Sequence, residues 1–256
     1  MTQTVDLNAD MGESYGPWVM GNDAELLKIV SSANIACGLH AGDWDVMATT
    51  MADAARKGVG IGAHPGFADL QGFGRRRVSM SGQSLANLVR YQVGAAIAVA
   101  RAAGGEVRHV KLHGAMANMA AEDEAMAKAA YEAVLSVDPE MILVVLAGTA
   151  QERAARALGA RWAGEIFADR AYNADATLVD RSKPGAVIHD PDIAGPRIAA
   201  MVMDGAIHTE DGTRIPARID TICLHGDGQT ALEIARSVRT ALEFAGVSVQ
   251  QFRGAR

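Results

Sequence analysis

The chain has 256 residues, of which 49% are hydrophobic and only 5% aromatic. This length fits one large α/β domain or two small ones, and the apolar content is sufficient for a sizeable core. The formal net charge of −6 comes from acidic and basic residues spread along the chain, which argues against a nucleic-acid or anionic-membrane partner.

Short apolar or β-branched runs recur along the chain, and each ends in a polar turn followed by a helical segment. This alternation is typical of a parallel sheet with crossover helices. Several runs are apolar throughout, as expected for strands that are buried on both faces. The seven predicted strands are Thr4–Asn8, Ala33–Cys37, Val59–Ala63, Val107–Leu112, Met141–Leu146, Arg161–Ile166 and Ile219–Leu224.

Capping residues mark the helices between these strands. Asp43 is predicted to cap a helix that ends at Gly58. The last helix is predicted to begin at Asp227, to carry a capping box formed by Thr230 and Glu233, and to end before Gly246. The other predicted segments are a helix over Ser84–Ala103, a helix near Ile193–Met203 and a hairpin over Ile207–Ile215 that turns on Asp211-Gly212.

Seven βα units are one short of the usual eight-stranded barrel, so we predict an incomplete or distorted barrel. An open doubly wound sheet is the alternative, although no G-x-G-x-x-G follows the first strand. No Pro/Ser-rich linker divides residues 1–256, which predicts a single α/β barrel domain. In either fold the site is expected at the C-terminal ends of the strands.

The N-terminus lacks the basic start and apolar run of a secretory signal, and the longest apolar stretch, 141–148, is too short to span a bilayer. Cys37 and Cys223 are too few for a disulfide framework and have no metal-finger spacing, so both are expected to be reduced thiols. A cytoplasmic protein is therefore expected. Cys37 is interpreted as a small buried thiol rather than a nucleophile.

Histidines are placed unusually in this chain. His40, His64, His113 and His225 each follow the end of a predicted strand, with a glycine one or two residues later. A histidine at such an address can hold a metal or move a proton near neutral pH. The alternative for each is a hydrogen-bonded loop histidine, but four at equivalent positions favour a functional set.

Charged residues near the strand ends complete the candidate site. Asp10 and Glu13 follow the first strand too closely for a regular helix, so they are expected to point into the barrel mouth; capping of the first helix is the alternative. Lys111 lies in an apolar strand, where a lysine needs a partner or a task. Asp169 and Arg170 are either an internal ion pair or substrate contacts.

The run Gly72–Arg77, GFGRRR, is suited to close over a carboxylate or phosphate, and the alternative is a solvated basic loop. The motifs G-x-x-x-x-G-K-[ST], G-x-S-x-G and H-E-x-x-H are absent from the sequence. Autonomous P-loop phosphotransfer, α/β-hydrolase chemistry and zincin chemistry are therefore unsupported.

Six spaced segments resemble the LamB/YcsF family of 5-oxoprolinase A subunits, in the right order and over nearly the whole chain. They are DLNADMGE (6–13), ANIACGLHAGD (33–43), GAHPGFADLQGFGRR (62–76), VKLHGAMAN (110–118), EIFADRAY (165–172) and CLHGDG (223–228). Leu112, Ala117 and Trp44 depart from the family pattern beside these motifs, where they bear on the substrate more than on the fold.

The resemblance implies ATP-dependent opening of 5-oxo-L-proline (pyroglutamate) to L-glutamate, together with separate B and C subunits. It also implies a distorted seven-stranded TIM-like (β/α) barrel of the glycoside hydrolase/deacetylase type. Barrels of that type often hold a divalent metal with an acid and two histidines, and Asp10, His64 and His113 are the matching triplet here.

The strand-end pattern and the resemblance together predict a catalytic set and a substrate-binding set. The catalytic set is Asp10, Glu13, His40, His64, Lys111, His113 and His225; the substrate-binding set is Asn8, Arg76, Asn118, Asp169 and Arg170. We expect a carboxylate or histidine to position water while Lys111 stabilises negative charge on the lactam oxygen. Two other hypotheses remain: a metal-dependent amidase or deacetylase that acts without ATP, and a non-catalytic substrate-binding subunit.

Overall fold

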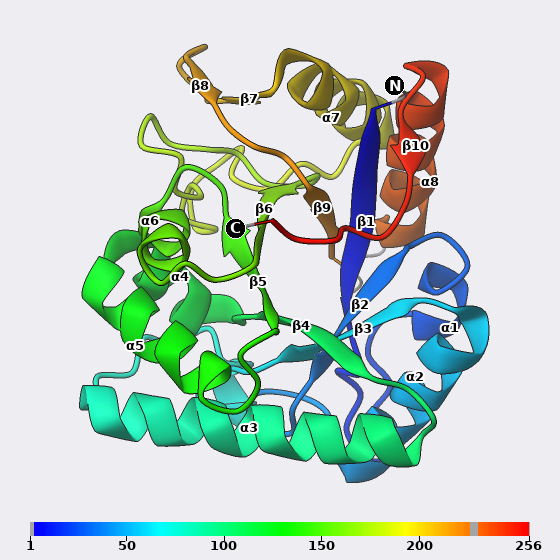
Figure 1. The fold of residues 1–256 in the computed structure, drawn as a ribbon. Coiled ribbons are helices and arrows are strands. Elements are labelled where there is room, and N and C mark those ends of the chain that lie inside the picture. The colour runs from blue at the N-terminus through cyan, green and yellow to red at the C-terminus, as the bar shows by residue number, and fades with distance from the viewer. Residues whose placement is uncertain (1–2, 226–229, 256) are drawn as a thin grey trace.

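Seven parallel strands close into a barrel in the computed structural model, which describes residues 3–225 and 230–255 (Figure 1). The strand order is β1-β2-β3-β4-β5-β6-β9, and a β1–β9 pairing closes the ring. The barrel strands are β1 (Thr4–Met11), β2 (Ser32–Ala36), β3 (Gly60–His64), β4 (Val107–Lys111), β5 (Ile142–Leu146), β6 (Trp162–Phe167) and β9 (Thr221–Leu224). The predicted seven-stranded barrel is confirmed, and the open-sheet alternative is wrong because the first and last barrel strands pair.

Helices cover the outside of the ring and bury the outward side chains of the strands (Figure 1). They are α1 (Asp23–Leu26), α2 (Trp44–Lys57), α3 (Gly82–Ala102), α4 (Gly114–Glu122), α5 (Glu124–Leu135), α6 (Ala150–Ala157), α7 (Pro191–Asp204) and α8 (Ala231–Phe244). A short 3₁₀ turn, Leu70–Gly72, precedes the basic run. Among the described residues, no helix is long and apolar enough to cross a membrane.

Most predicted helix ends agree with the structure. The Asp43 side chain accepts hydrogen bonds from the backbone N–H groups of Asp45 and Val46, and Gly58 ends the same helix in the left-handed region. The predicted capping box at Thr230 is wrong, because its side chain makes no capping bond and its backbone, at φ −96° and ψ 6°, is not in the extended region that capping requires. The predicted helix start at Asp227 lies outside the described residues.

Two further strand pairs lie outside the ring. Strands β7 (Ala206–His208) and β8 (Arg214–Pro216) form an antiparallel hairpin, which confirms the turn predicted at Asp211-Gly212. Strand β10 (Ser248–Val249) adds to the beginning of β1.

The first strand is longer than predicted, and this changes the position of Asp10. β1 runs to Met11 rather than Asn8, so Asp10 belongs to the strand instead of following it. Because side chains alternate along a strand, Asp6, Asn8 and Asp10 share one face, which is buried in the barrel interior. In the sequence, the polar residues Asn8 and Asp10 after Leu7 were interpreted as the end of the strand. In the structure, these residues belong to the strand and line a polar barrel lumen.

A hydrogen-bond network connects the polar side chains of β1 with those of the neighbouring strands in this lumen. The Asn8 amide donates to Glu165 Oε1 at 3.0 Å and to Thr221 Oγ1 at 2.7 Å. The Asn34 amide donates to Asn8 Oδ1 at 2.7 Å and to Asp10 Oδ1 at 2.9 Å. A buried polar network of this kind fixes side-chain positions, since each lost bond leaves a desolvated group unpaired.

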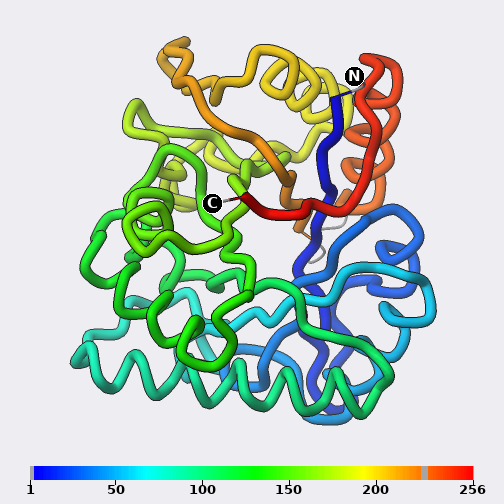
Figure 2. Tube along the Cα trace, viewed as in Figure 1, coloured from blue at the N-terminus to red at the C-terminus, as the bar shows by residue number. Residues whose placement is uncertain are grey.

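The C-terminal tail closes the opposite end of the barrel, where the strands begin. In Figure 2 the tail crosses the ring after β10, shown in red. Its Phe252 side chain is buried with Ile142, Val144 and Ala163 and contacts the His109 ring edge-on at 5.1 Å. The tail therefore fills the lumen from that side.

Candidate active site

A cavity of about 500 Å³ opens at the C-terminal ends of the barrel strands. Six of the seven predicted catalytic residues line it: Asp10, Glu13, His64, Lys111, His113 and His225. The seventh, His40, is completely buried and stacks on the His113 ring at 3.8 Å. Residues far apart in the sequence are thus brought together at one end of one barrel.

Lys111 lies at the centre of the cavity floor and is almost fully buried. Its ammonium nitrogen lies 3.0 Å from Asp10 Oδ1, 2.9 Å from Glu165 Oε1 and 2.9 Å from Cys223 Sγ. One buried cation therefore compensates two buried carboxylates. This arrangement explains a lysine in an apolar strand, because the partners come from strands on other sides of the ring.

The pKa values of this group follow from burial and from the shared charge. Burial lowers the pKa of Lys111, but Asp10, Cys223 and Glu165 outweigh it and raise that pKa well above its ordinary value. Burial also raises the pKa of Asp10, yet His64 and Lys111 bring it well below the usual range. The pKa of Glu165 is raised by burial, only partly opposed by Lys111. Asp10 thus carries the negative charge that faces the cavity.

Two histidine rings meet at this floor. A backbone carbonyl oxygen next to one nitrogen of each ring determines which nitrogen carries the hydrogen. His64 Nδ1 lies 2.8 Å from the Lys111 carbonyl oxygen, and His113 Nε2 lies 2.8 Å from the Phe73 carbonyl oxygen. Both ring nitrogens must donate, because a carbonyl oxygen only accepts. The remaining nitrogens, His64 Nε2 and His113 Nδ1, face each other at 3.0 Å.

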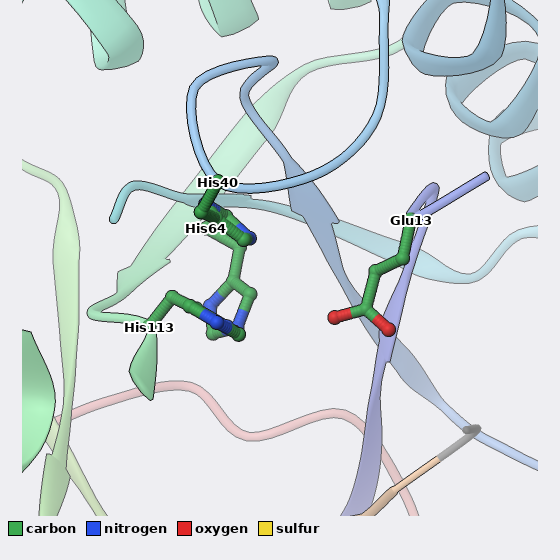
Figure 3. Close-up of side chains that lie close together, drawn as sticks. All are labelled: Glu13, His40, His64 and His113. Carbon is green, nitrogen blue, oxygen red and sulfur yellow. The ribbon is translucent and has the colours of Figure 1, made fainter. Parts of the chain in front are cut away.

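A third ring and a carboxylate complete the cluster (Figure 3). The His40 ring is parallel to the His113 ring within 11°, and neither of its nitrogens has a hydrogen-bond partner among the described residues. Burial, with His113 and His64 next in effect, moves the pKa of His40 well below its ordinary value. Figure 3 shows the Glu13 carboxylate, at the end of β1, pointing toward the three rings.

Glycine makes room for the stacked rings. Gly74 has a φ of +62°, and a Cβ there would lie 2.7 Å from His40 Cβ and 2.8 Å from His113 Cδ2. The backbone of the loop after β3 therefore passes against the ring pair at a distance that no side chain permits.

Asp169 and Arg170, which were predicted as a pair, contact different partners. Asp169 accepts from His225 Nδ1 at 2.7 Å, and Arg170 donates to the carbonyl oxygens of Ala186 and Val179. Arg170 still lines the cavity, and burial lowers its pKa to about 10. Of the two alternatives for these neighbours, the internal ion pair is not formed, because Asp169 pairs with His225.

The remaining predicted substrate contacts are distributed unevenly. Asn118 lines the cavity. Asn8 lies beneath it in the lumen, where it supports Glu165. Arg76 forms an ion pair with Asp69 outside the cavity, whereas its neighbours Arg75 and Arg77 line the wall. Asn8 and Arg76 thus lack the direct access to the cavity that the sequence interpretation gave them.

Two residues of the floor were not in either predicted set. Glu165 pairs with Lys111, and Cys223 accepts from the same ammonium group. Glu165 carried a signal that could have found it, since it stands in the apolar strand WAGEIF as Lys111 stands in its own strand. Cys223 carried none, because a thiol in an apolar strand is ordinary core packing.

Two chemical capacities follow from this geometry. The ionised Asp10 and the basic ring nitrogens can orient or deprotonate water, and the Lys111 ammonium supplies positive charge close by. The wall carries four basic residues, Arg75, Arg77, Arg181 and Lys183, and two acidic ones, Asp180 and Glu122, the second of which pairs with Arg77. The excess of positive charge favours an anionic ligand. The cavity is thus suited to hydrolytic attack on a ligand that bears negative groups.

Comparison with known proteins gives a consistent result over the whole chain. The sequence profile of the LamB/YcsF family matches residues 5–256. The 5-oxoprolinase A subunit of Ruegeria pomeroyi is 67% identical over 248 residues, covering 97% of this chain and 98% of that protein. The 5-oxoprolinase A subunit of Rhodopseudomonas palustris (strain BisB18) is 53% identical over 252 residues, covering 98% and 99%.

Solved structures agree with the fold. The lactam utilization protein from Thermus thermophilus superposes with a TM-score of 0.91 at 45% identity, covering 98% of this chain and all of that one. A putative cellobiose-phosphate cleavage protein from Enterococcus faecalis has a TM-score of 0.58 at 13% identity, covering 98% of both chains. The similarity to the Enterococcus faecalis protein, at 13% identity, shows a shared fold only.

Proposed function

The chain belongs to the LamB/YcsF family, and from this premise we propose that it is the A subunit of an ATP-dependent 5-oxoprolinase, which opens 5-oxo-L-proline to L-glutamate. The observation that carries the proposal is the cavity floor, where Asp10, Lys111, His64 and His113 converge from three strands and one loop. A set of this kind supplies both a base for water and a positive charge for an oxygen.

The chemistry of a lactam explains why such a floor is needed. The ring amide is resonance-stabilised, and its closure is favourable, so opening requires an external driving force. Transfer of a phosphoryl group from ATP to the amide oxygen weakens the amide resonance and makes the carbon attackable. One water then adds to that carbon and the carbon–nitrogen bond breaks, which leaves a glutamyl phosphate. A second water hydrolyses this acyl phosphate, and the products are glutamate, ADP and inorganic phosphate.

The residues of the floor divide these tasks. Asp10 stays ionised beside Lys111 and is placed to accept a proton from the attacking water. Lys111 is placed to stabilise negative charge that develops on the former carbonyl oxygen. His64 and His113 each hold one nitrogen without a hydrogen at the cavity floor, where it can help to orient the attacking water. The proton that Asp10 accepts can then pass to the departing ring nitrogen.

The basic wall takes the anionic parts of the reactants. Arg75, Arg77, Arg181 and Lys183 come from the loops after β3 and β6 and lie on the cavity surface. Their charges match the carboxylate of 5-oxoproline and the phosphate groups of ATP. The cavity volume of about 500 Å³ is far more than a five-membered ring needs, which leaves room for a second reactant.

Partner chains are part of this proposal. The related proteins are named as A subunits, so their enzymes contain more than one kind of chain. We propose B and C subunits as the partners of this chain. Because the sequence carries no P-loop motif, the partners are expected to contribute to ATP handling.

One assay separates this function from its two competitors. The purified chain is mixed with 5-oxoproline, with and without ATP and with and without B and C subunits, and glutamate and ADP are measured together. The proposal predicts glutamate only when ATP and the partners are present. Glutamate from the chain alone without ATP would indicate a metal-dependent amidase. Binding of 5-oxoproline by the chain, with full turnover by partners alone, would indicate a substrate-binding subunit.

A further inference from the structure

Four buried side chains at the edge of the cavity floor form a donor set, and two of them, Glu13 and His40, have no role in the proposed lactam chemistry. Glu13, His40, His64 and His113 each place one ligand atom within 4.8 Å of the other three (Figure 3). All four are less than 9% exposed. Three imidazoles and one carboxylate are brought to this point by four different segments of the chain.

The hydrogen positions leave two lone pairs facing each other. His64 donates through Nδ1 to the Lys111 carbonyl, and His113 donates through Nε2 to the Phe73 carbonyl. In neutral rings, His64 Nε2 and His113 Nδ1 therefore carry lone pairs at a separation of 3.0 Å. Something positive must lie between them, since two lone pairs at this distance repel. Donation of the far ring N–H to a backbone carbonyl is also the usual support of a metal-binding histidine.

His40 supplies an independent observation. Its ring is 0% exposed, and neither nitrogen has a hydrogen-bond partner among the described residues. A buried polar ring without a partner is costly, so it calls for an explanation such as an ion. The ring stacks on His113 and contacts His64 edge-on at 5.6 Å, which directs it into the same cluster.

Asp10 is engaged elsewhere. Its Oδ1 atom is 3.0 Å from the Lys111 ammonium, and its Oδ2 atom is 3.4 Å from His64 Nε2. The lysine would hold this carboxylate away from an ion between the two histidines. The Glu13 carboxylate faces the three rings (Figure 3).

We propose that Glu13, His40, His64 and His113 bind one divalent transition-metal ion, with Zn²⁺ as the matching probe. Imidazole and carboxylate donors suit zinc and its first-row neighbours, whereas Mg²⁺ and Ca²⁺ prefer sites made of oxygen atoms. Ligand atoms of a tetrahedral zinc site lie about 3.3 Å apart, given bonds of about 2.0–2.1 Å. The 3.0 Å between the two facing nitrogens is close to that spacing. When bound, such an ion acts as a Lewis acid at the edge of the cavity floor.

This site replaces Asp10 of the predicted triplet by Glu13 and His40 and keeps His64 and His113. It does not depend on the identity of the substrate, because its evidence is the donor geometry. The competing account is a single proton shared by His64 and His113, which leaves His40 unexplained.

The test is metal binding by the full chain. Protein purified without chelator is analysed for bound metal by mass spectrometry, then stripped and titrated with Zn²⁺ by calorimetry, with Mg²⁺ as the hard-cation comparison. We expect one equivalent of Zn²⁺, an increase in melting temperature, and no binding of Mg²⁺ at the same concentration. X-ray absorption of the zinc-loaded wild-type chain is expected to show only nitrogen and oxygen ligands, with three imidazoles.

Variants locate the site. Glu13→Gln and His40→Gln are expected to weaken Zn²⁺ binding at least about tenfold, and Asp10→Asn is expected to retain one equivalent. His208→Gln is the matched control, because His208 pairs with Asp204 in the β7–β8 region and lies outside the cavity lining. Circular dichroism of each variant establishes that it is folded.

Three results would overturn the proposal. The first is a stripped wild-type chain that takes up no more Zn²⁺ than Mg²⁺, as expected if a shared proton fills the gap. The second is equal Zn²⁺ affinity for the wild type, Glu13→Gln and His40→Gln. The third is an absorption spectrum with sulfur in the ligand shell, which would place the ion at Cys223 instead. The spectrum needs no variant, so it decides even where a variant fails to fold.

Discussion

At the scale of single residues, the shared charge of Lys111 is the feature on which the cavity floor depends. One ammonium group compensates Asp10 and Glu165, which are both buried. Removing one member of a buried ion pair is costly because it leaves an uncompensated charge. In the proposed mechanism the Lys111 ammonium group also stabilises negative charge on the substrate. Changes at Lys111 are therefore expected to affect both stability and activity.

We expect Lys111→Met to abolish glutamate formation and to lower the free energy of unfolding by about 3–5 kcal/mol. Adding Glu165→Gln should recover part of that stability, because one of the two orphaned carboxylates is then neutral, but should not recover activity. Urea unfolding and the glutamate assay on both variants check this. Equal stability of the single and double variants would show that Glu165 does not share the lysine charge.

A second residue-scale prediction concerns Asp6, which is fully buried in the lumen on the same face of β1 as Asn8 and Asp10. Burial raises its pKa from 3.8 to about 6, although hydroxyls of Ser31, Thr221 and Ser32 donate to it. The native state therefore holds this proton more tightly than the unfolded state. Its contribution to stability is greatest below about pH 4, falls as the pH rises to about 6, and is constant above that.

For a shift of this size the loss between pH 4 and pH 7 is about 3 kcal/mol. In Asp6→Asn this loss should be absent, so the stability of the wild type relative to the variant should decline over that range. Urea unfolding at several pH values measures the difference. Two parallel pH profiles would contradict the expected titration of Asp6.

At the scale of elements, glycine in the loop after β3 lets the backbone approach the stacked rings. A Cβ at Gly74 would meet both His40 and His113, whereas a Cβ at Gly104, with φ +79°, would meet nothing within 4 Å. Both positions have a left-handed backbone, so the two substitutions share the cost of strain and differ only in crowding.

Gly104→Ala is expected to lower stability by about 1–2 kcal/mol and to leave activity unchanged. Gly74→Ala is expected to cost more and to reduce glutamate formation, because His40 and His113 must move. Thermal unfolding and the glutamate assay on the matched pair check this. Similar activity losses in both variants would mean that strain alone, and not displacement of the rings, explains the effect.

The elements were largely predictable from sequence, for physical reasons. Strands buried on both faces leave continuous apolar runs, and the left-handed Gly58 with the Asp43 cap fixed both ends of α2. The end of β1 was not predictable in the same way. Its alternation of Asp6, Asn8 and Asp10 is typical of an exposed strand face, whereas here that face lines a polar lumen.

At the scale of the whole molecule, closure of the ring brings the predicted site residues together. The β1–β9 pairing joins the first and last strands of the ring and places the ends of β1, β3, β4 and β9 around one cavity. The address shared by the strand-end histidines was sufficient to predict this convergence. The partners within the cavity were not, since the Lys111–Glu165 pairing and the separation of Asp169 from Arg170 depend on the strand order around the ring.

The C-terminal tail gives a prediction at this scale. Phe252 fills the end of the barrel opposite the cavity. Phe252→Ala should lower the free energy of unfolding by about 3–5 kcal/mol, as for other buried aromatic truncations, while the cavity floor stays intact. Chemical unfolding and zinc titration of the variant check this. Loss of zinc binding in a folded Phe252→Ala chain would show that the two ends of the barrel are coupled.

The central claim is that one barrel rim opens the lactam, and the most direct measurement is glutamate and ADP production by the assembled enzyme carrying Asp10→Asn, Lys111→Met or His113→Gln. His208→Gln serves as the folded control. We predict equal amounts of glutamate and ADP from the wild type and the control, and at least about a hundredfold less glutamate from each rim variant. Wild-type glutamate formation by all three rim variants would contradict the account.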